Sequence, residues 1–245
     1  NEGNATNFLL QPDTAGGVVS ITGFALFNGT PPNPPSADTT LPIVNATFNN
    51  TSPKKNFRPI ANDGVEANEL VQKFFMEAER LLKPGCCCCC CGGGGGPDPQ
   101  FARWSLWLDE HLEFKQMIVW DKGPMGMGWH YRRSYETILV AQKKGANCKW
   151  HDESSQIENI ISPNYKGIRK IIPSAEQHPT EKPKELASHF IGLHSERGEI
   201  VLDPFTGSGT TLRAAKDLGR KYIGIEIEEK YCDMAIKRLG QEVLF

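Results

Sequence analysis

The stretch from Asp203 to Thr210 combines an acid, paired glycines and hydroxyl side chains directly after a short apolar segment. It reads Asp203, Pro204, Phe205, Thr206, Gly207, Ser208, Gly209 and Thr210. Glycine permits a tight turn and lets a ligand approach the backbone closely, and a helix that starts here would present unpaired N–H groups. A second acid, Glu226, follows nineteen residues after Gly207, where its carboxylate could accept hydrogen bonds from both hydroxyls of a ribose. The spacing therefore predicts a nucleoside-binding βαβ unit.

The same stretch differs from two common nucleotide-binding patterns. It lacks the third glycine of the dinucleotide fingerprint and the Gly-Lys-Ser/Thr of a phosphate-binding loop, so neither NAD nor ATP is expected. The strand before the turn, the paired glycines and the distal acid together favour a ligand. A tight strand-to-helix turn that binds nothing stays open as the alternative.

The segments around this turn have to place it between a strand and a helix. A strand is expected over 200–203, a helix over 211–218, a second strand over 222–227 and a second helix over 230–239. Another helix is expected from Pro183 to about His194, because proline in the first helical turn leaves no N–H unsatisfied. The β-α-β-α order predicts parallel strands with crossover helices, and therefore an α/β fold.

The central part of the chain predicts further helices and strands from the spacing of its apolar residues. Helices are expected over 65–82 and about 101–111, strands over 114–120 and 137–142, and a long loop or small subdomain over 151–177. The six consecutive cysteines Cys86 to Cys91 are interpreted as a buried strand that leads into a glycine loop over 92–96. Adjacent strand residues point to opposite faces, so these cysteines do not offer spaced ligands and no metal is expected.

Composition limits the classes of protein to which the chain can belong. With 245 residues, 39% of them apolar, and a formal net charge of −2, it can bury a core but is not expected to coat nucleic acid indiscriminately. No apolar run approaches the roughly 18 residues of a membrane span, and residues 1–20 lack a secretory pattern, so no membrane is expected. Residues 1–53 are nearly uncharged and rich in Asn, Thr, Pro and Gly, and only 18–27 resemble a strand.

Three sequence segments together resemble a known family. They are the turn from Asp203 to Thr211, the upstream His178-Pro179-Thr180-Glu181-Lys182-Pro183 and the downstream Tyr222-Ile223-Gly224-Ile225-Glu226-Ile227. From about Ser52 to the C-terminus the chain resembles the DNA amino-methyltransferases that modify adenine N6 or cytosine N4, in the β-class order with the catalytic segment first. The resemblance implies a Rossmann-like S-adenosylmethionine methyltransferase sheet with helices on both faces and a small target-recognition segment.

The resemblance also implies the division of the chain and the cofactor site. The expected parts are an atypical segment (1–53), a catalytic-side half (54–143), a target-recognition segment (144–177) and a cofactor-binding half (178–245). Phe205 to Gly209 would wrap S-adenosylmethionine, Glu226 would hold its ribose, and Thr180 with Lys182 would close the pocket, although Lys182 could instead be an exposed helix-start lysine. The expected cofactor-binding residues are Asp203, Pro204, Phe205, Thr206, Gly207, Gly209, Thr210, Glu226, Thr180 and Lys182.

The catalytic motif of the family is the part that this sequence matches least. Members carry Asp, Asn or Ser followed by two prolines and an aromatic residue, whose oxygens orient the exocyclic amine and whose ring stacks on the flipped base. The nearest tetrapeptide is Asn33-Pro34-Pro35-Ser36, with serine in place of the ring. Asn33, Pro34, Pro35 and Ser36 are therefore the candidate catalytic residues, and a plain proline-rich loop is the alternative.

Double-stranded DNA is the expected partner, with its contacts in 123–133 and 144–177. Basic residues would hold phosphates while aromatic residues support an extruded base, and the candidate contacts are Lys122, Trp129, His130, Arg132 and Arg133. A homodimer stays open. The expected location is the cytoplasm, as for bacterial or phage restriction-modification enzymes.

The sequence leads to one main functional hypothesis and two alternatives. The main hypothesis is methyl transfer from S-adenosylmethionine to adenine N6 in DNA or, less favoured, cytosine N4. One alternative is an impaired remnant that binds cofactor or DNA without turnover, because the catalytic ring is missing. The other is a methyltransferase for RNA or a small molecule.

Overall fold

The computed structural model describes residues 7–10, 66–92, 100–124, 132, 134–163, 165–168 and 180–241. The chain forms two compact units, one of residues 1–40, 54–57 and 171–245 and the other of 41–53 and 58–170. Several expected features lie outside the described residues: the strand over 18–27, the tetrapeptide Asn33 to Ser36, the glycine loop beyond Gly92, and the side chains of Trp129, His130 and Arg133. No helix within the described ranges is long and apolar enough to cross a membrane.

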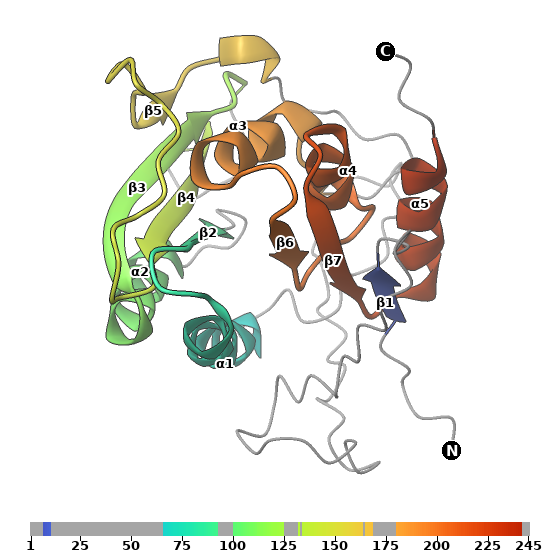
Figure 1. Ribbon diagram of the computed structural model, residues 1–245, viewed down its shortest axis with the longest axis horizontal. Helices are drawn as coiled ribbons and strands as arrows, with labels where there is room; N and C mark the ends of the chain where they lie inside the picture. Colours follow the sequence, from blue (N-terminus) through green and yellow to red (C-terminus); the bar gives the residue numbers. More distant parts are fainter. Residues whose placement is uncertain are drawn as a thin grey trace. The chain divides into compact units, whose positions relative to one another are not determined.

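The first unit contains a three-stranded sheet in the order β1-β7-β6 (Figure 1). Its strands are β1 (Asn7–Leu10), β6 (Ile200–Asp203) and β7 (Lys221–Glu226). β6 and β7 are parallel, with Asp203 opposite Gly224, and the helix between them makes the crossover. The predicted parallel pair is therefore confirmed. β1, which pairs antiparallel with β7, has no counterpart among the expected strands.

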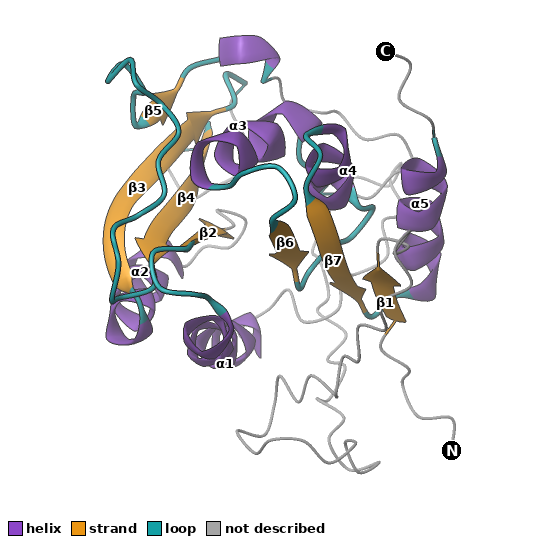
Figure 2. Ribbon diagram, viewed as in Figure 1, coloured by secondary structure: helices purple, strands orange, loops and turns teal. Residues whose placement is uncertain are grey.

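Three helices of the first unit, drawn in purple in Figure 2, share one apolar core with β7. They are α3 (Lys184–His194), α4 (Thr210–Asp217) and α5 (Glu229–Gly240). Apolar residues recur on each helix at spacings of three and four, which aligns them on one face. The core consists of Ile191, Leu212, Ala214, Ala215, Tyr222, Cys232, Ala235 and Leu239. All three helices were expected, and their ends lie within one residue of the expected ones.

The second unit is a four-stranded sheet in the order β2-β4-β3-β5, with two helices on one face. Its elements are α1 (Glu66–Leu81), β2 (Cys87–Gly92), α2 (Gln100–His111), β3 (Glu113–Asp121), β4 (Tyr135–Gln142), β5 (Ile160–Ile161) and a 3-10 turn (Tyr165–Gly167). β4 runs antiparallel to both neighbours, and β5 is parallel to β3. The helices and the three longer strands confirm the sequence expectations.

The cysteine run is a strand, as expected, but it is not buried throughout. Cys88 is buried and Cys89 is exposed, while Cys86, Cys87 and Cys90 are intermediate. Side chains alternate along a strand, so Cys88 lies in the core with α1 and α2 and Cys89 lies on the opposite face. Burial raises the pKa of the Cys88 thiol to about 12. The expectation failed at Cys89, because α1 and α2 pack on the face of the strand that carries Cys88.

This alternation predicts unequal reactivity of the neighbouring thiols. At pH 8, iodoacetamide should label Cys89 at least about tenfold faster than Cys88, because alkylation needs an accessible thiolate and burial suppresses the thiolate of Cys88. Fragment-resolved mass spectrometry of the labelled peptide measures both rates, and Cys89→Ser should remove the fast phase. Equal rates at the two positions would contradict the alternating strand.

Candidate functional site

The loop between β6 and α4 is a compact turn with internal hydrogen bonds. The Thr206 N–H donates to the Ile225 carbonyl (3.0 Å), and the Gly209 N–H donates to the Thr206 carbonyl (2.9 Å). The Thr206 hydroxyl also donates to the Asp203 carbonyl (3.3 Å). These bonds fix the loop against the end of β7, so that its backbone is preorganised before any ligand binds.

Gly209 is required by the conformation and by the close packing of α5. Its φ angle is 80°, in the left-handed region that favours glycine. A Cβ atom at this position would lie 2.6 Å from the Cβ and 2.9 Å from the Cα of Ala235. The glycine that the sequence assigns to a ligand-binding turn therefore also lets α5 pack against the start of α4.

Glu226 lies at the end of β7 and its carboxylate contacts the glycine turn directly. Its Oε2 accepts the Gly207 N–H (2.7 Å), and its Oε1 accepts the Glu228 N–H (2.9 Å). The side chain is buried, with 9% of the residue exposed. Burial raises the pKa of Glu226, and the backbone N–H donors partly offset this by favouring the carboxylate. The Ile227 N–H is a third backbone donor to this carboxylate, and the acceptor capacity that remains can bind hydroxyl groups of a ligand.

Asp203 shapes the turn from its first position. Its carboxylate accepts the Phe205 N–H (3.0 Å) and a hydrogen bond from the Thr211 side chain. Burial raises the pKa of Asp203 in spite of these donors. Asp203 therefore fixes the loop conformation, and its expected contact with the cofactor stays a prediction, as does that of Glu226.

Two large apolar side chains are exposed near the carboxyl ends of β6 and β7. Phe205 is 50% exposed and Ile227 is 40% exposed. The carboxyl ends of parallel strands meet at one edge of a sheet, which is where α/β proteins bind ligands. An apolar ring system next to the Glu226 carboxylate would suit these side chains.

The segment before α3 reaches the glycine loop through Glu181, which was not among the expected site residues. Glu181 Oε2 accepts the Ser208 hydroxyl (2.8 Å), and its Oε1 pairs with Arg238 Nη2 (2.7 Å). Of the two residues expected in this segment, Thr180 is exposed and Lys182 is half-buried. Only 7% of the Glu181 side chain is exposed. Glu181 lies in the segment from His178 to Pro183 that resembles the family, but nothing in the sequence indicated that Ser208 and Arg238 would be its partners.

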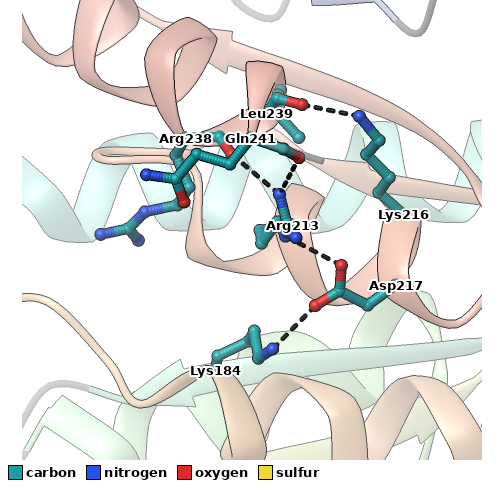
Figure 3. A network of polar contacts seen from close by, with 7 residues as sticks. All are labelled: Lys184, Arg213, Lys216, Asp217, Arg238, Leu239 and Gln241. Carbon is teal, nitrogen blue, oxygen red and sulfur yellow. Dashed lines mark hydrogen bonds and ion pairs between the residues drawn. The ribbon is translucent and has the colours of Figure 1, made fainter. Parts of the chain in front are cut away.

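A polar network anchors the C-terminal end of α5 (Figure 3). Arg213 donates to the carbonyls of Arg238 (3.1 Å) and Gln241 (2.6 Å), and Lys216 donates to the Leu239 carbonyl (2.6 Å). These carbonyls lack partners within the helix, and cations at a helix C-terminus are also favoured by the helix dipole. The end of α5 is therefore held by two cations of α4.

The same network continues to the start of α3 through one acid. Asp217 pairs with Arg213 (2.8 Å) and with Lys184 (2.7 Å), as Figure 3 shows. Nearby lies a pocket of about 320 Å³ lined by Glu181, Lys184, Glu185, Thr210, Arg213, Arg238 and Gln241. Its three cations are paired with Asp217 or Glu181, so within the described residues the pocket offers an anionic ligand no unpaired cation, and its remaining charged side chain is the acid Glu185.

Only Lys122 and Arg132 of the expected DNA contacts have described side chains. Lys122 Nζ lies 2.9 Å from Glu136 Oε1, with 17% and 15% of the two side chains exposed. The Lys122 N–H also donates to the Ser134 carbonyl (2.7 Å). Lys122 therefore links the end of β3 to β4. Arg132 is exposed, and its contact with DNA stays a prediction.

The ion pair of Lys122 leads to a prediction that separates these two roles. Lys122→Met should lower the free energy of unfolding by about 1–3 kcal/mol, because it leaves the half-buried Glu136 carboxylate without its cation. The salt dependence of DNA binding should stay unchanged. Urea denaturation and DNA titrations at several salt concentrations measure the two effects. A slope reduced by about 0.9 with unaltered stability would instead make Lys122 a phosphate contact.

Comparison of the chain with known proteins identifies the family to which it belongs. A family model described as DNA methylase, of the N6 and N4 type, matches residues 62–237. The type II methyltransferase M2.DpnII of Streptococcus pneumoniae is 34% identical over 137 residues, which cover 51% of this chain and 50% of that protein. The DNA adenine methyltransferase YhdJ of Escherichia coli is 33% identical over 152 residues, covering 51% and 52%. The chain thus spans about half the length of these curated relatives.

Solved structures share the fold. The M1.HpyAVI–SAM complex is 28% identical with a TM-score of 0.58, covering 74% of this chain and 85% of that one. The cytosine-N4-specific PvuII DNA methyltransferase has a TM-score of 0.59 at 18% identity, covering 74% of each chain, which is a likeness of fold alone. The expected Rossmann-like methyltransferase fold is confirmed. The match over 62–237 shows that this chain belongs to the DNA methylase family of N6 and N4 methyltransferases.

Proposed function

We propose that the chain transfers a methyl group from S-adenosylmethionine to an exocyclic base amine of double-stranded DNA, with adenine N6 favoured over cytosine N4. The observation that carries the proposal is the contact between the Glu226 carboxylate and the Gly207 N–H at the end of β7. Support also comes from the relatives, because one of them is described as a DNA adenine methyltransferase. Such an enzyme would act in the cytoplasm of a bacterium, in restriction-modification or a related process.

The described residues fit S-adenosylmethionine. The Glu226 carboxylate would accept the ribose hydroxyls with the acceptor capacity that its three backbone N–H donors, of Gly207, Ile227 and Glu228, leave. Phe205 and Ile227 offer exposed apolar surface for the adenine. The turn from Gly207 to Gly209 leaves room for the amino-acid end, and Thr180 with Lys182 would close the site. When bound, the cofactor supplies a methyl group on an electrophilic sulfonium.

The catalytic side of the reaction is assigned to Asn33, Pro34, Pro35 and Ser36. The Asn33 amide oxygen and the Pro34 carbonyl would accept the two amine hydrogens and turn the nitrogen lone pair toward the methyl group. Ser36 cannot stack on a flipped base as an aromatic ring does. DNA would be held by Arg132 and Arg133, with Trp129 and His130 beside the extruded base.

The missing ring supports a second candidate function. A chain with an intact cofactor site and Ser36 in place of the aromatic residue would bind S-adenosylmethionine and DNA without transferring the methyl group. The two candidates share every residue of the cofactor site and differ only in turnover.

Tritium transfer tests both candidates. Labelled S-adenosylmethionine is incubated with unmethylated genomic DNA, or with RNA in a parallel reaction, and calorimetry measures cofactor binding separately. Incorporation into DNA that Asn33→Ala abolishes without weakening cofactor binding would support the enzyme with catalysis at Asn33. Binding without incorporation would support the second candidate, incorporation into RNA alone would exclude DNA as the substrate, and absence of binding would refute both functions.

A further inference from the structure

We propose that Arg238 is the positioning residue of the cofactor site, coupling the segment that carries Thr180 and Lys182 to the glycine loop. This inference rests on the proposed function, because it assigns both parts to one cofactor site. Arg238 belongs to α5, outside the turn and outside the three segments that resemble the family. Its role comes from its contacts.

The guanidinium of Arg238 joins three side chains from two separate segments. Nη2 pairs with Glu181 Oε1 (2.7 Å). Nη1 donates to Thr210 Oγ1 (2.5 Å) at the start of α4 and, at a longer 3.3 Å, to Ser208 Oγ in the loop. The planar fork of arginine can serve acceptors on two sides at once, which the single ammonium of lysine cannot do in the same geometry.

A fourth hydrogen bond closes the arrangement into a ring. The Ser208 hydroxyl donates to Glu181 Oε2 (2.8 Å) while its oxygen accepts from Arg238. Both oxygens of the buried Glu181 carboxylate are therefore occupied, one by a cation and one by the loop. The segment before α3 is thus fixed to the loop by charge-assisted bonds, which are about twice as strong as neutral ones.

Arg238 can position these segments because its own backbone is anchored. Arg213 donates to the Arg238 carbonyl, and Lys216 donates to the carbonyl of Leu239 next to it. Leu239 is buried in the core shared by α3, α4 and α5. The guanidinium therefore extends from a fixed helix end, and the residues that it contacts take their positions from that end.

Removing the guanidinium would leave the Glu181 carboxylate buried without a cation, which proteins avoid by rearrangement. The segment from Thr180 to Pro183 would then move away from the loop. Cofactor affinity would fall, because the two sides of the site would have to be reassembled on binding. The rate at saturating cofactor would change little, because Arg238 makes no contact with Glu226 or with the exposed side chains of Phe205 and Ile227 among the bonds described above.

The experiment compares variants by calorimetric titration with S-adenosylhomocysteine, a stable probe. Arg238→Met should weaken binding about 10- to 50-fold, and Arg238→Lys should recover only part of this loss. Glu181→Gln should weaken binding by about 5- to 10-fold, and the double variant should bind no worse than Arg238→Met, because the two residues act as one unit. Arg220→Met is the matched control: it removes a guanidinium of the same unit that donates to Ser195 and to the Leu218 carbonyl but contacts neither Glu181, the loop nor Arg238, and binding should stay within about twofold.

Two further readouts separate positioning from a general loss of structure. In Arg238→Met, hydrogen exchange should accelerate over 180–183 and 206–210 but not in the β7 core, and KM for S-adenosylmethionine should rise while kcat stays within about threefold. If wild-type protein binds no probe, the proposed function fails whatever Arg238 does. If wild type binds and Arg238→Met binds equally well, the positioning role is overturned. Should Arg238→Met not fold, Glu181→Gln decides, and wild-type affinity in that variant would overturn the role.

Discussion

Gly209→Ala should lower the free energy of unfolding of the first unit by about 2–5 kcal/mol. This is the sum of a left-handed backbone penalty of about 1–2 kcal/mol and an overpacking penalty of about 1–3 kcal/mol. The φ angle of 80° is unfavourable for alanine. The new methyl group would also lie 2.6 Å from the Cβ of Ala235, so α5 would have to move. Urea denaturation followed by circular dichroism measures the change.

Three other glycines of the same unit separate the two penalties. Gly198 has a φ of 83° and nothing within 4 Å of an added Cβ, so Gly198→Ala isolates the backbone penalty. Gly224→Ala isolates the packing penalty, because its Cβ would lie 2.5 Å from Leu212 Cδ1 and no positive φ is involved. Gly192, inside α3, has neither problem, and alanine there should stabilise by about 0.5–1 kcal/mol. A Gly209→Ala effect no larger than that of Gly198→Ala would show that α5 yields at no cost.

The C-terminal elements could be predicted from the sequence because their signals are local. Apolar periodicity gave α4 and α5, and the glycine turn between two apolar segments gave the β6-α4-β7 unit within one residue. The contact of Glu226 with Gly207 also follows from local geometry, because parallel neighbouring strands end at the same edge. The positions of the strands, the glycine turn and Glu226 relative to one another can therefore be predicted without knowledge of the rest of the fold.

Features that depend on tertiary partners could not be predicted in the same way. The burial of Cys88 and the exposure of Cys89 depend on which face α1 and α2 cover. Lys122 is indistinguishable in sequence from a surface lysine until β4 places Glu136 beside it. Arg238 contacts residues 28, 30 and 57 positions away, and no periodicity records such pairings. The type of a charged residue therefore does not show whether its side chain contacts a ligand or forms a structural ion pair.

Glu226→Ala should weaken the binding of S-adenosylmethionine by about 100- to 10,000-fold. The carboxylate would make two charge-assisted hydrogen bonds to the ribose, each contributing about 1.5–3 kcal/mol, and about 1.4 kcal/mol corresponds to tenfold in affinity. Glu226→Gln should also bind poorly, because an amide nitrogen would face the N–H of Gly207 or Glu228. Calorimetric titration measures both, with Glu228→Gln as the control, since this change keeps the backbone N–H that donates to Glu226.

The pH dependence tests the same residue independently of mutation. Burial raises the pKa of Glu226 above its ordinary value of 4.5, and the ionised form is the acceptor of both hydroxyls. As pH falls through the raised pKa, a proton occupies the carboxylate and cofactor affinity declines, starting at a higher pH than for an exposed glutamate.

The stability of the protein without cofactor depends on pH with the opposite sign. The folded state binds this proton more tightly than the unfolded state, so stability falls as pH rises from 4.5 through the raised pKa. Cofactor should therefore add more to the melting temperature at pH 7.5 than at pH 5.5, and Glu226→Gln should lose that difference. An unchanged pH profile in Glu226→Gln would assign the titration to another group, and the raised pKa of Asp203 makes its carboxyl the first to test.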